Sequence, residues 1–351
     1  MNWRSFIQTL VAVATLGAAA LYAGIAMIDP YDTIRYAPPL ERAPTAANQR
    51  FAFPALARKV AFDSAIIGTS TTRLLRPRDL DPLFGARFVN LSMNSATAWE
   101  QSQILAVFLR DKARIDTVIF GVDVVWCATG DTFEKLTPRP FPDWMYDANP
   151  WNDLVHLFNF PTLQEAGRQL AHLTGIRRSR NGIDGYTNFL PDPAEYDLAR
   201  ARQHLYGTSE PRPRPAGDPA EIARLAAAGG WKFPTHDLFE EMLAGIAPST
   251  RIIVVFVPYH IASQGDGSDA DAARWLACKQ AIGRVVGRHP NAIALDFMIP
   301  SAITRRDENY WDPLHYTLDV ATEVARLIAE GARTGQSEPD RFDVLVAPGA
   351  K

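Results

Sequence analysis

The amino-acid sequence predicts an α/β protein, a three-layer sandwich around a mainly parallel β-sheet. Five short apolar runs have the length and the Val, Ile and Phe content of strands buried on both faces, at residues 64–67, 87–91, 117–122, 252–257 and 292–297. Amphipathic helical patterns lie between or after several of these runs, at residues 99–114, 270–288 and 317–332. This alternation favours a flavodoxin-like arrangement with helices on both faces of the sheet.

A long apolar run at the N-terminus predicts a membrane anchor. Residues 6–28 contain no charged side chain, and their number, about 23, suits a transmembrane helix better than the shorter apolar core of a signal peptide. Arg4 precedes the run and Asp29 and Asp32 follow it, which favours a single-pass anchor (residues 1–28) with the rest of the chain on the periplasmic, extracytoplasmic side. A cleaved signal peptide is the alternative, because the run also contains alanines suited to a cleavage site.

The remaining chain is expected to hold one folded domain with an insertion. Five prolines between residues 29 and 58 indicate an extended tether, since proline blocks long helices and central strands. The folded domain covers residues 59–335, and residues 128–249 are interpreted as an inserted helical cap. Most aromatic side chains of the insertion are expected to form its own core, although Trp144 and Trp151 also suit a sugar-binding groove. Residues 336–351 are expected to form a loose tail.

Composition and motifs disfavour several classes of function. The net charge of −3 gives no electrostatic case for a nucleic-acid partner. The sequence has no GxxxxGK[ST] motif and no convincing GxGxxG motif, which disfavours a kinase or a dehydrogenase. The histidines show no metal-ligand spacing, so neither a metal nor a cofactor is predicted. The two cysteines, Cys127 and Cys278, allow one disulfide at most, and the sequence does not show whether they lie close together.

A serine follows the first predicted strand. After the apolar run 64–67, Gly68-Thr69-Ser70 breaks the strand and places Ser70 at its carboxyl end, where ligands bind in open α/β sheets. A serine hydroxyl is a poor nucleophile alone; it needs a base to take its proton and donors to hold the oxyanion. The alternative is an ordinary strand-to-helix turn with a capping serine.

A suitable base appears just before the last predicted helix. Asp312 precedes His315 by three residues, a spacing that brings the two side chains together in a turn. Histidine exchanges a proton near neutral pH, and a nearby aspartate can fix its tautomer and stabilise the imidazolium. An isolated Asp-x-x-His pair is a weak signal, but its combination with Ser70 on an α/β pattern is much more specific.

Together these motifs resemble the SGNH/GDSL hydrolase superfamily over roughly residues 61–332. In that family a Gly-Asp-Ser follows the first strand and an Asp-x-x-His precedes the last helix, which implies Ser70 as nucleophile, His315 as base and Asp312 as its orienting partner. The family's second block is a glycine turn whose backbone N–H helps to hold the oxyanion, and Ser95 takes that place here. Its third block carries an asparagine that donates to the oxyanion, and Asp123 takes that place.

These two oxyanion positions depart from the family pattern. Ser95 still offers a backbone N–H, provided that the turn tolerates its side chain. An ionised Asp123 would repel a developing oxyanion by about 4 kcal/mol at 4 Å and an effective dielectric near 20. Either its carboxyl group points elsewhere, or it is protonated, or catalysis is modest. Thr69 replaces the family's aspartate, which is not part of the triad.

Within the superfamily, the apolar anchor followed by Asp29-Pro30-Tyr31 is similar to membrane-anchored envelope members, including proteins that O-acetylate alginate and other polysaccharides. The resemblance implies ester hydrolysis or O-acyl transfer through an acyl-serine, with an acyl donor and a polysaccharide acceptor, or an ester substrate, as partners. His260 is a less favoured second base, since such a histidine more often shapes the pocket wall. The alternative is a catalytically inactive envelope scaffold or polysaccharide-binding protein, which the departures at Ser95 and Asp123 motivate.

Overall fold

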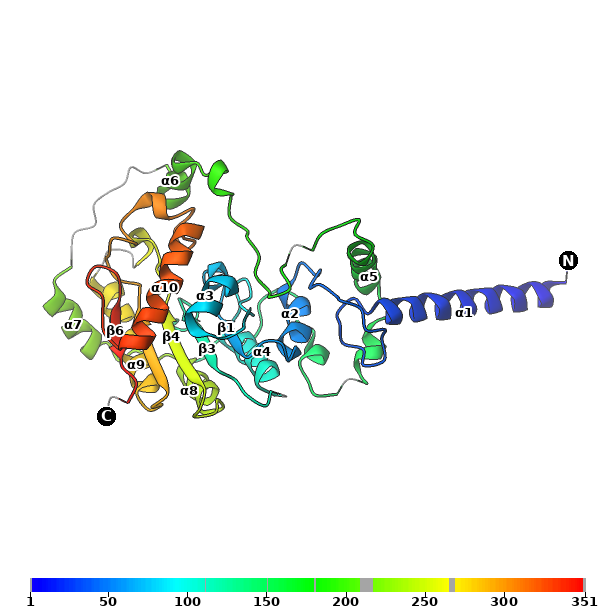
Figure 1. Cartoon of the computed structure of the whole chain (residues 1–351), viewed down its shortest axis with the longest axis horizontal. Coiled ribbons are helices and arrows are strands. Elements are labelled where there is room, and N and C mark those ends of the chain that lie inside the picture. The colour runs from blue at the N-terminus through cyan, green and yellow to red at the C-terminus, as the bar shows by residue number, and fades with distance from the viewer. Residues whose placement is uncertain are drawn as a thin grey trace. The chain divides into compact units, whose positions relative to one another are not determined.

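The structure is a computed structural model that describes residues 2–110, 112–149, 151–179, 181–208, 217–264 and 269–349. The chain, shown in Figure 1, divides into two compact units. The first unit comprises Met1–Leu56 and Pro140–Ile183, and the second comprises Ala57–Arg139 and Asp184–Lys351. All five residues predicted to act in catalysis belong to the second unit.

The second unit is built on a six-stranded sheet in the order β2-β1-β3-β4-β5-β6. The first five strands run parallel to one another, and β6 is antiparallel to β5. Their bounds are β1 Ser64–Ile67, β2 Phe88–Asn90, β3 Thr117–Val122, β4 Arg251–Phe256, β5 Ala292–Asp296 and β6 Asp343–Val346. The α/β class and the mainly parallel sheet predicted from the sequence are confirmed, and each of the five predicted strands is present.

Burial explains why short apolar runs form the central strands. Every residue of β1, β3 and β5 is buried, and in β4 only Arg251 is exposed. The parallel register places Ile67 beside Phe120 and Gly121 beside Val255. The carboxyl ends of β1, β3 and β4 therefore meet at one edge of the sheet, and the loops that follow these strands are brought together there.

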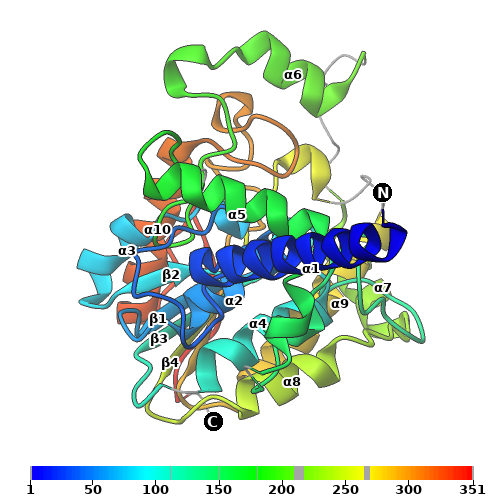
Figure 2. The ribbon, with the colours of Figure 1, turned by 90° about the vertical axis from the view of Figure 1, so that its right-hand side faces the viewer.

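Helices cover both faces of this sheet. Their bounds are α3 Pro77–Phe84, α4 Ala98–Arg110, α8 His236–Ala244, α9 Asp269–Val286 and α10 Leu318–Thr334. Helix α3 packs against α10 on one face, whereas α4, α8 and α9 form a row on the other, as Figure 2 shows. Right-handed crossovers that step in opposite directions along a parallel sheet place their helices on opposite faces, which accounts for the separation of α3 from α4, α8 and α9.

The interruption between β3 and β4 does not fold as one cap over the sheet. Its part 140–183 belongs to the first unit, and its later part contributes α6 Leu198–Tyr206, α7 Pro219–Ala228 and α8 to the second. Helix α8 packs on α4 and α9, and α7 packs on α9. Because α8 buries Phe239 and Leu243, it joins the helical layer of the sheet rather than a separate cap.

The chain after Gly335 also differs from the expected loose tail. Strand β6 pairs with the edge of β5, and the ring of Phe342 stacks on Phe297 with centroids 5.1 Å apart. Phe342 is fully buried, so its ring is one apolar contact that holds the strand at the sheet edge, and β6 also packs against α9. Ala350 and Lys351, the end of the predicted tail, lie outside the described residues.

The first unit contains most of the stretch predicted to be an extended tether. Its helices are α1 Trp3–Ile28, α5 Phe160–Leu173 and the larger part of α2 Gln49–Arg58. Tyr31 and Phe53 are buried, and Pro54 lies inside α2. The tether prediction is wrong because prolines limit regular structure without preventing burial. As predicted, α1 is long and apolar enough to cross a membrane.

Candidate active site

Ser70 lies on the turn that follows β1, at the carboxyl edge of the parallel strands. Strand β1 has β2 on one side and β3 on the other, so the chain steps one way after β1 and the opposite way after β2. In open α/β sheets, ligands bind outside the strand ends at such a reversal point. The turn continues into the short 3₁₀ helix η1, Thr72–Leu74, and leaves Ser70 partly exposed.

Ser70, His315 and Asp312 form one hydrogen-bonded series. The hydroxyl of Ser70 lies 2.9 Å from His315 Nε2, and His315 Nδ1 lies 2.7 Å from Asp312 Oδ2. With the proton on Nδ1, the ring donates to the carboxylate and accepts from the hydroxyl. The structure therefore brings together the three residues that the sequence predicts as a triad, although Ser70 and His315 are 245 positions apart.

Asp312 is held with its carboxylate toward the imidazole. Its Oδ1 also accepts the backbone N–H groups of Leu314 and His315, at 2.9 and 3.0 Å. Burial alone would raise the pKa of this carboxyl group, but the hydrogen bond and charge of His315, with the two N–H groups, hold the pKa below its usual value. The carboxylate therefore stays ionised and can accept the N–H of the ring.

Two glycines let the turn after β1 lie close to the sheet. Thr72 is buried at the ends of β1 and β3, and a Cβ on either Gly68 or Gly121 would overlap its side chain. The hydroxyl of Tyr316 donates to a backbone carbonyl of the same turn at 2.9 Å. The turn is thus fixed both to the sheet and to the loop that carries the histidine.

Ser95 occupies the turn after β2 in a conformation that suits a glycine. Its φ of 52° lies in the left-handed region, and its side chain is exposed, so the turn accommodates the serine. Within the described part of the chain, the backbone N–H groups of Ser70 and Ser95 make no hydrogen bond to the protein. Both N–H groups are therefore available to a ligand.

The carboxyl group of Asp123 accepts hydrogen bonds from neighbouring groups of the protein. It is buried at the end of β3, where its two oxygens accept hydrogen bonds from the Thr69 hydroxyl and, at 3.0 Å, from the backbone N–H of Val125. Burial raises its pKa to about 6, although the two hydrogen bonds oppose this shift. Of the alternatives that the sequence leaves open, the structure favours a carboxyl group engaged in fixing the two loops next to Ser70.

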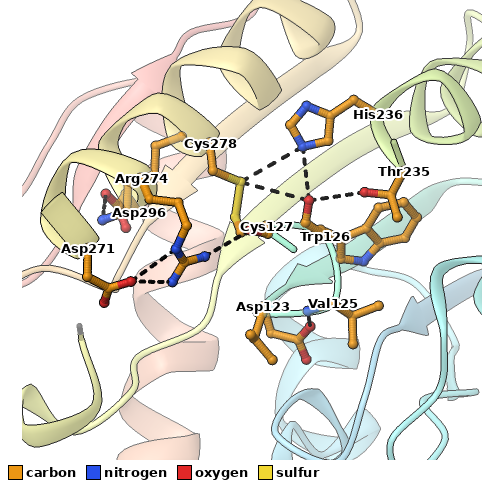
Figure 3. Close-up of a disulfide and its surroundings, with 12 residues drawn as sticks. Asp123, Val125, Trp126, Cys127, Thr235, His236, Asp271, Arg274, Cys278 and Asp296 are labelled. Atoms are coloured by element: carbon orange, nitrogen blue, oxygen red, sulfur yellow. Dashed lines mark hydrogen bonds and ion pairs between the residues drawn. A yellow bond between two sulfur atoms is a disulfide. The ribbon is translucent and has the colours of Figure 1, made fainter. Parts of the chain in front are cut away.

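The loop after Asp123 is fastened to the helical layer, as Figure 3 shows. A disulfide joins Cys127 to Cys278 on α9, and Arg274 of α9 donates to the carbonyl of Cys127 at 2.9 Å. The carbonyl of Trp126 lies 3.0 Å from Nε2 of His236 on α8. Burial lowers the pKa of His236 to about 4, so the ring is neutral near pH 7 and donates this hydrogen bond.

Arg73 is a candidate site residue that sequence reasoning missed. The residue is 3% exposed, and its guanidinium donates to Asn94 Oδ1 at 2.5 Å and lies 5.0 Å from the ring centroid of Phe189. The same ring meets the His315 imidazole edge to face at 5.3 Å. Burial lowers the pKa of Arg73 to about 10. Its place three residues after Ser70 was the one available signal, and nothing in the sequence indicated that it would be buried against the ring that also contacts the histidine.

The other side chains singled out in the sequence lie elsewhere. His260 is fully buried and contacts Asp307, with 3.4 Å between Nε2 and Oδ1, and the ring of Tyr310. These contacts with Asp307 and Tyr310 fit a wall position better than a second base. Trp144 and Trp151 belong to the first unit, and their described ring contacts are made within it.

A cleft of about 150 Å³ lies beside the Asp312–His315 loop. It is lined by the aromatic rings of Tyr196 and Trp311, by prolines of the loop before α6 and by the start of α10. The two rings meet edge to face, with centroids 6.2 Å apart. The cleft thus offers flat apolar surfaces and polar rims, and it is bounded by Trp311 and Thr317, which flank the Asp312–His315 loop in the sequence.

Comparison of the chain with models of protein families finds no match, and comparison with curated proteins finds no match either. Among the described residues, no group of three or more His, Cys, Asp or Glu side chains is placed to hold a metal ion. The site is therefore characterised by its own geometry: a hydroxyl, an imidazole and a carboxylate in series, two available backbone N–H groups, and an aromatic cleft.

Proposed function

We propose that this chain is a serine-dependent acyl-ester hydrolase or O-acyltransferase that works through an acyl-serine intermediate. The observation that carries the proposal is the pair of hydrogen bonds, 2.9 and 2.7 Å long, that connect Ser70 to His315 and His315 to Asp312. In this arrangement the imidazole can remove the hydroxyl proton as the oxygen attacks, and the carboxylate stabilises the imidazolium that forms.

The proposed reaction has two steps. In the first, Ser70 Oγ attacks the ester carbonyl while His315 takes the hydroxyl proton, and the N–H groups of Ser70 and Ser95 donate to the tetrahedral oxyanion. The intermediate collapses to the acyl-serine, and His315 returns the proton to the leaving alcohol. In the second step, water or a sugar hydroxyl attacks the acyl-serine, gives its proton to His315 and regenerates the serine.

A carbohydrate acceptor is the substrate that the neighbouring cleft supports best. Tyr196 and Trp311 present aromatic surfaces in a cleft that borders the loop carrying the histidine, and such surfaces suit the apolar faces of sugar rings. The basic side chain of Arg200 lies 5.4 Å from the ring centroid of Trp311 and adds a polar group at the same place. We therefore infer that the acyl group is transferred to, or removed from, a polysaccharide.

The fold and the disulfide support an extracytoplasmic relative of the SGNH hydrolases. The strand order, the serine after β1 and the Asp-x-x-His before α10 agree with the resemblance to the membrane-anchored envelope branch of that superfamily. Disulfides persist in oxidising compartments such as the periplasm, so the bridge between Cys127 and Cys278 favours a site outside the cytoplasm. In this proposal α1 anchors the chain in the membrane with both units on that side.

Hydrolysis of a short-chain nitrophenyl ester by the purified full chain tests this function. We expect turnover by the wild type, loss of turnover in Ser70→Ala, and wild-type turnover in Ser249→Ala, which removes an exposed serine of the same unit. Addition of an oligosaccharide acceptor then separates the two activities: a transferase yields acylated sugar, whereas a hydrolase yields only the free acid. An unchanged rate in Ser70→Ala would contradict the proposal, and an absence of turnover by the wild type would favour a polysaccharide-binding scaffold.

A further inference from the structure

The C-terminal end of α1 packs against a segment with outward-facing apolar side chains. The ring of Tyr22 lies 6.1 Å from that of Phe158, and the Tyr22 hydroxyl donates to the carbonyl of Leu154 at 2.8 Å. We call residues 151–160 the interfacial segment. Its large apolar side chains are mostly exposed: Trp151 58%, Val155 75%, Phe158 55% and Phe160 70%. All of these contacts lie within the first unit.

The length of α1 places this segment at the edge of a bilayer. The helix has 26 residues and is therefore about 39 Å long, whereas a hydrocarbon core of about 30 Å needs roughly 20 residues. Residues 3–21 are exposed, and the contacts with the first unit begin at Tyr22. The exposed part, about 28 Å long, therefore fills the hydrocarbon core, and Tyr22 and Phe158 lie at its boundary. Trp3 and Tyr22 mark the two ends of this span, as aromatic residues do at membrane interfaces.

The junction between α1 and the first unit is fixed rather than flexible. Arg42 is buried and donates to the last carbonyls of the helix, at 2.8 Å to Ile28 and 3.3 Å to Met27. The Asp29 carboxylate accepts the backbone N–H groups of Thr33 and Ile34 at 3.0 and 2.9 Å. Because the helix end is held in this way, the interfacial segment keeps its level relative to the membrane span.

We propose that the interfacial segment lies in the interfacial layer of the bilayer that α1 crosses, with its apolar side chains between lipid headgroups and acyl chains. Exposed apolar patches of this kind mark membrane or protein contacts, and the continuity of this one with the transmembrane helix selects the lipid surface. The inference rests on the membrane anchoring proposed above and is independent of the catalytic role of Ser70. The interfacial segment is then a second membrane contact of the first unit, in addition to α1.

Spin-label accessibility in liposomes tests this placement on the full chain. Nitroxide labels are attached to Val155→Cys and Phe158→Cys, and collision rates with apolar oxygen and with a water-soluble nickel complex are compared by electron paramagnetic resonance. Val13→Cys, in the exposed middle of α1, serves as the lipid reference. Leu83→Cys, a 46% exposed apolar position on α3 of the second unit, serves as the water reference.

We expect the oxygen-to-nickel ratio at residues 155 and 158 to be severalfold above that at residue 83 and below that at residue 13. The Val155→Cys variant keeps the ring contact between Phe158 and Tyr22, which Phe158→Cys removes. A local structural defect in the Phe158→Cys variant therefore does not decide the result. If the ratio at residue 13 indicates lipid while the ratios at residues 155 and 158 equal that at residue 83, the interfacial placement is wrong, but membrane anchoring by α1 is still supported. If residue 13 is also in water, both the anchor and this inference fall, whereas the ester assay on Ser70 is unaffected.

Discussion

Replacing Asp123 by asparagine removes a buried charge at the end of β3 without changing the shape of the side chain. The wild-type carboxyl accepts hydrogen bonds from Thr69 and Val125. In Asp123→Asn the amide oxygen can accept the Val125 N–H, and the amide nitrogen can donate to the Thr69 hydroxyl, which also accepts. Both hydrogen bonds are preserved, so the variant isolates the effect of the charge.

The magnitude follows from the raised pKa. Burial moves the pKa of Asp123 from 3.8 to about 6, so the ionised form is less favourable in the folded than in the unfolded chain. Below pH 3.8, Asp123 does not change the unfolding free energy of the wild type. As the pH rises from 3.8 to about 6, this residue lowers the unfolding free energy, and the loss persists at higher pH. A shift of about two pH units corresponds to about 3 kcal/mol. Asp123→Asn should therefore be more stable than the wild type at pH 7.5 and nearly equal to it at pH 4.

Urea unfolding of the two proteins in detergent, followed by tryptophan fluorescence at both pH values, measures this difference. Other groups titrate equally in both proteins, so the pH dependence of the difference belongs to residue 123. We expect the gap in unfolding free energy to widen by about 2 kcal/mol between pH 4 and pH 7.5. A difference in unfolding free energy that stays constant with pH would refute the claim that burial raises the pKa of the Asp123 carboxyl group. A roughly hundredfold gain in esterase activity, the size of one oxyanion donor's contribution, would instead place residue 123 in the oxyanion site, because the amide would donate where the carboxylate repels.

Three further substitutions test the site and its support. Asp312→Asn removes the charge that orients His315, and ester hydrolysis should fall by about 10⁴-fold with the fold intact by circular dichroism; an unchanged rate would exclude Asp312 from the triad. Gly121→Ala places a methyl group on the buried Thr72, so thermal unfolding should show a loss of about 1–3 kcal/mol, and unaltered stability would contradict the close approach. Cys278→Ser opens a bridge that spans 151 residues and should lower the unfolding free energy by about 2–5 kcal/mol, whereas a wild-type value, or an intact free thiol on Cys127 in the native protein, would contradict the disulfide.

The sheet could be predicted because its strands carry a local signal. Runs such as 64–67 and 117–122 are apolar throughout, as strands buried on both faces must be, and helical patterns separate several of them. The expected loose tail hides β6, whose four residues alternate between exposed and half-buried. Such a short edge strand depends on the burial of Phe342 against Phe297, a contact that no local pattern reveals.

The candidate site could be predicted only as far as its motifs extend. Ser70 was found because it follows an apolar strand that ends at a glycine. Asp312 and His315 were found because they lie in a turn just before the last helix. Arg73 was missed because its meaning depends on Phe189, a residue 116 positions later that lies over its guanidinium. The tether was misjudged for a related reason: prolines report backbone restriction, whereas the burial of Tyr31 and Phe53 depends on partners distant in the chain.

The most direct measurement of the central claim is covalent labelling by a fluorophosphonate, followed by mass spectrometry of the labelled peptide. An activated serine attacks the phosphorus and displaces fluoride, whereas an ordinary serine does not react. We predict one adduct on Ser70 in the wild type and in His289→Ala, a histidine control in the turn after α9 that contacts Glu240, and none in His315→Ala. Absence of an adduct on Ser70 in the wild type, or equal labelling of His315→Ala, would contradict an imidazole-activated serine.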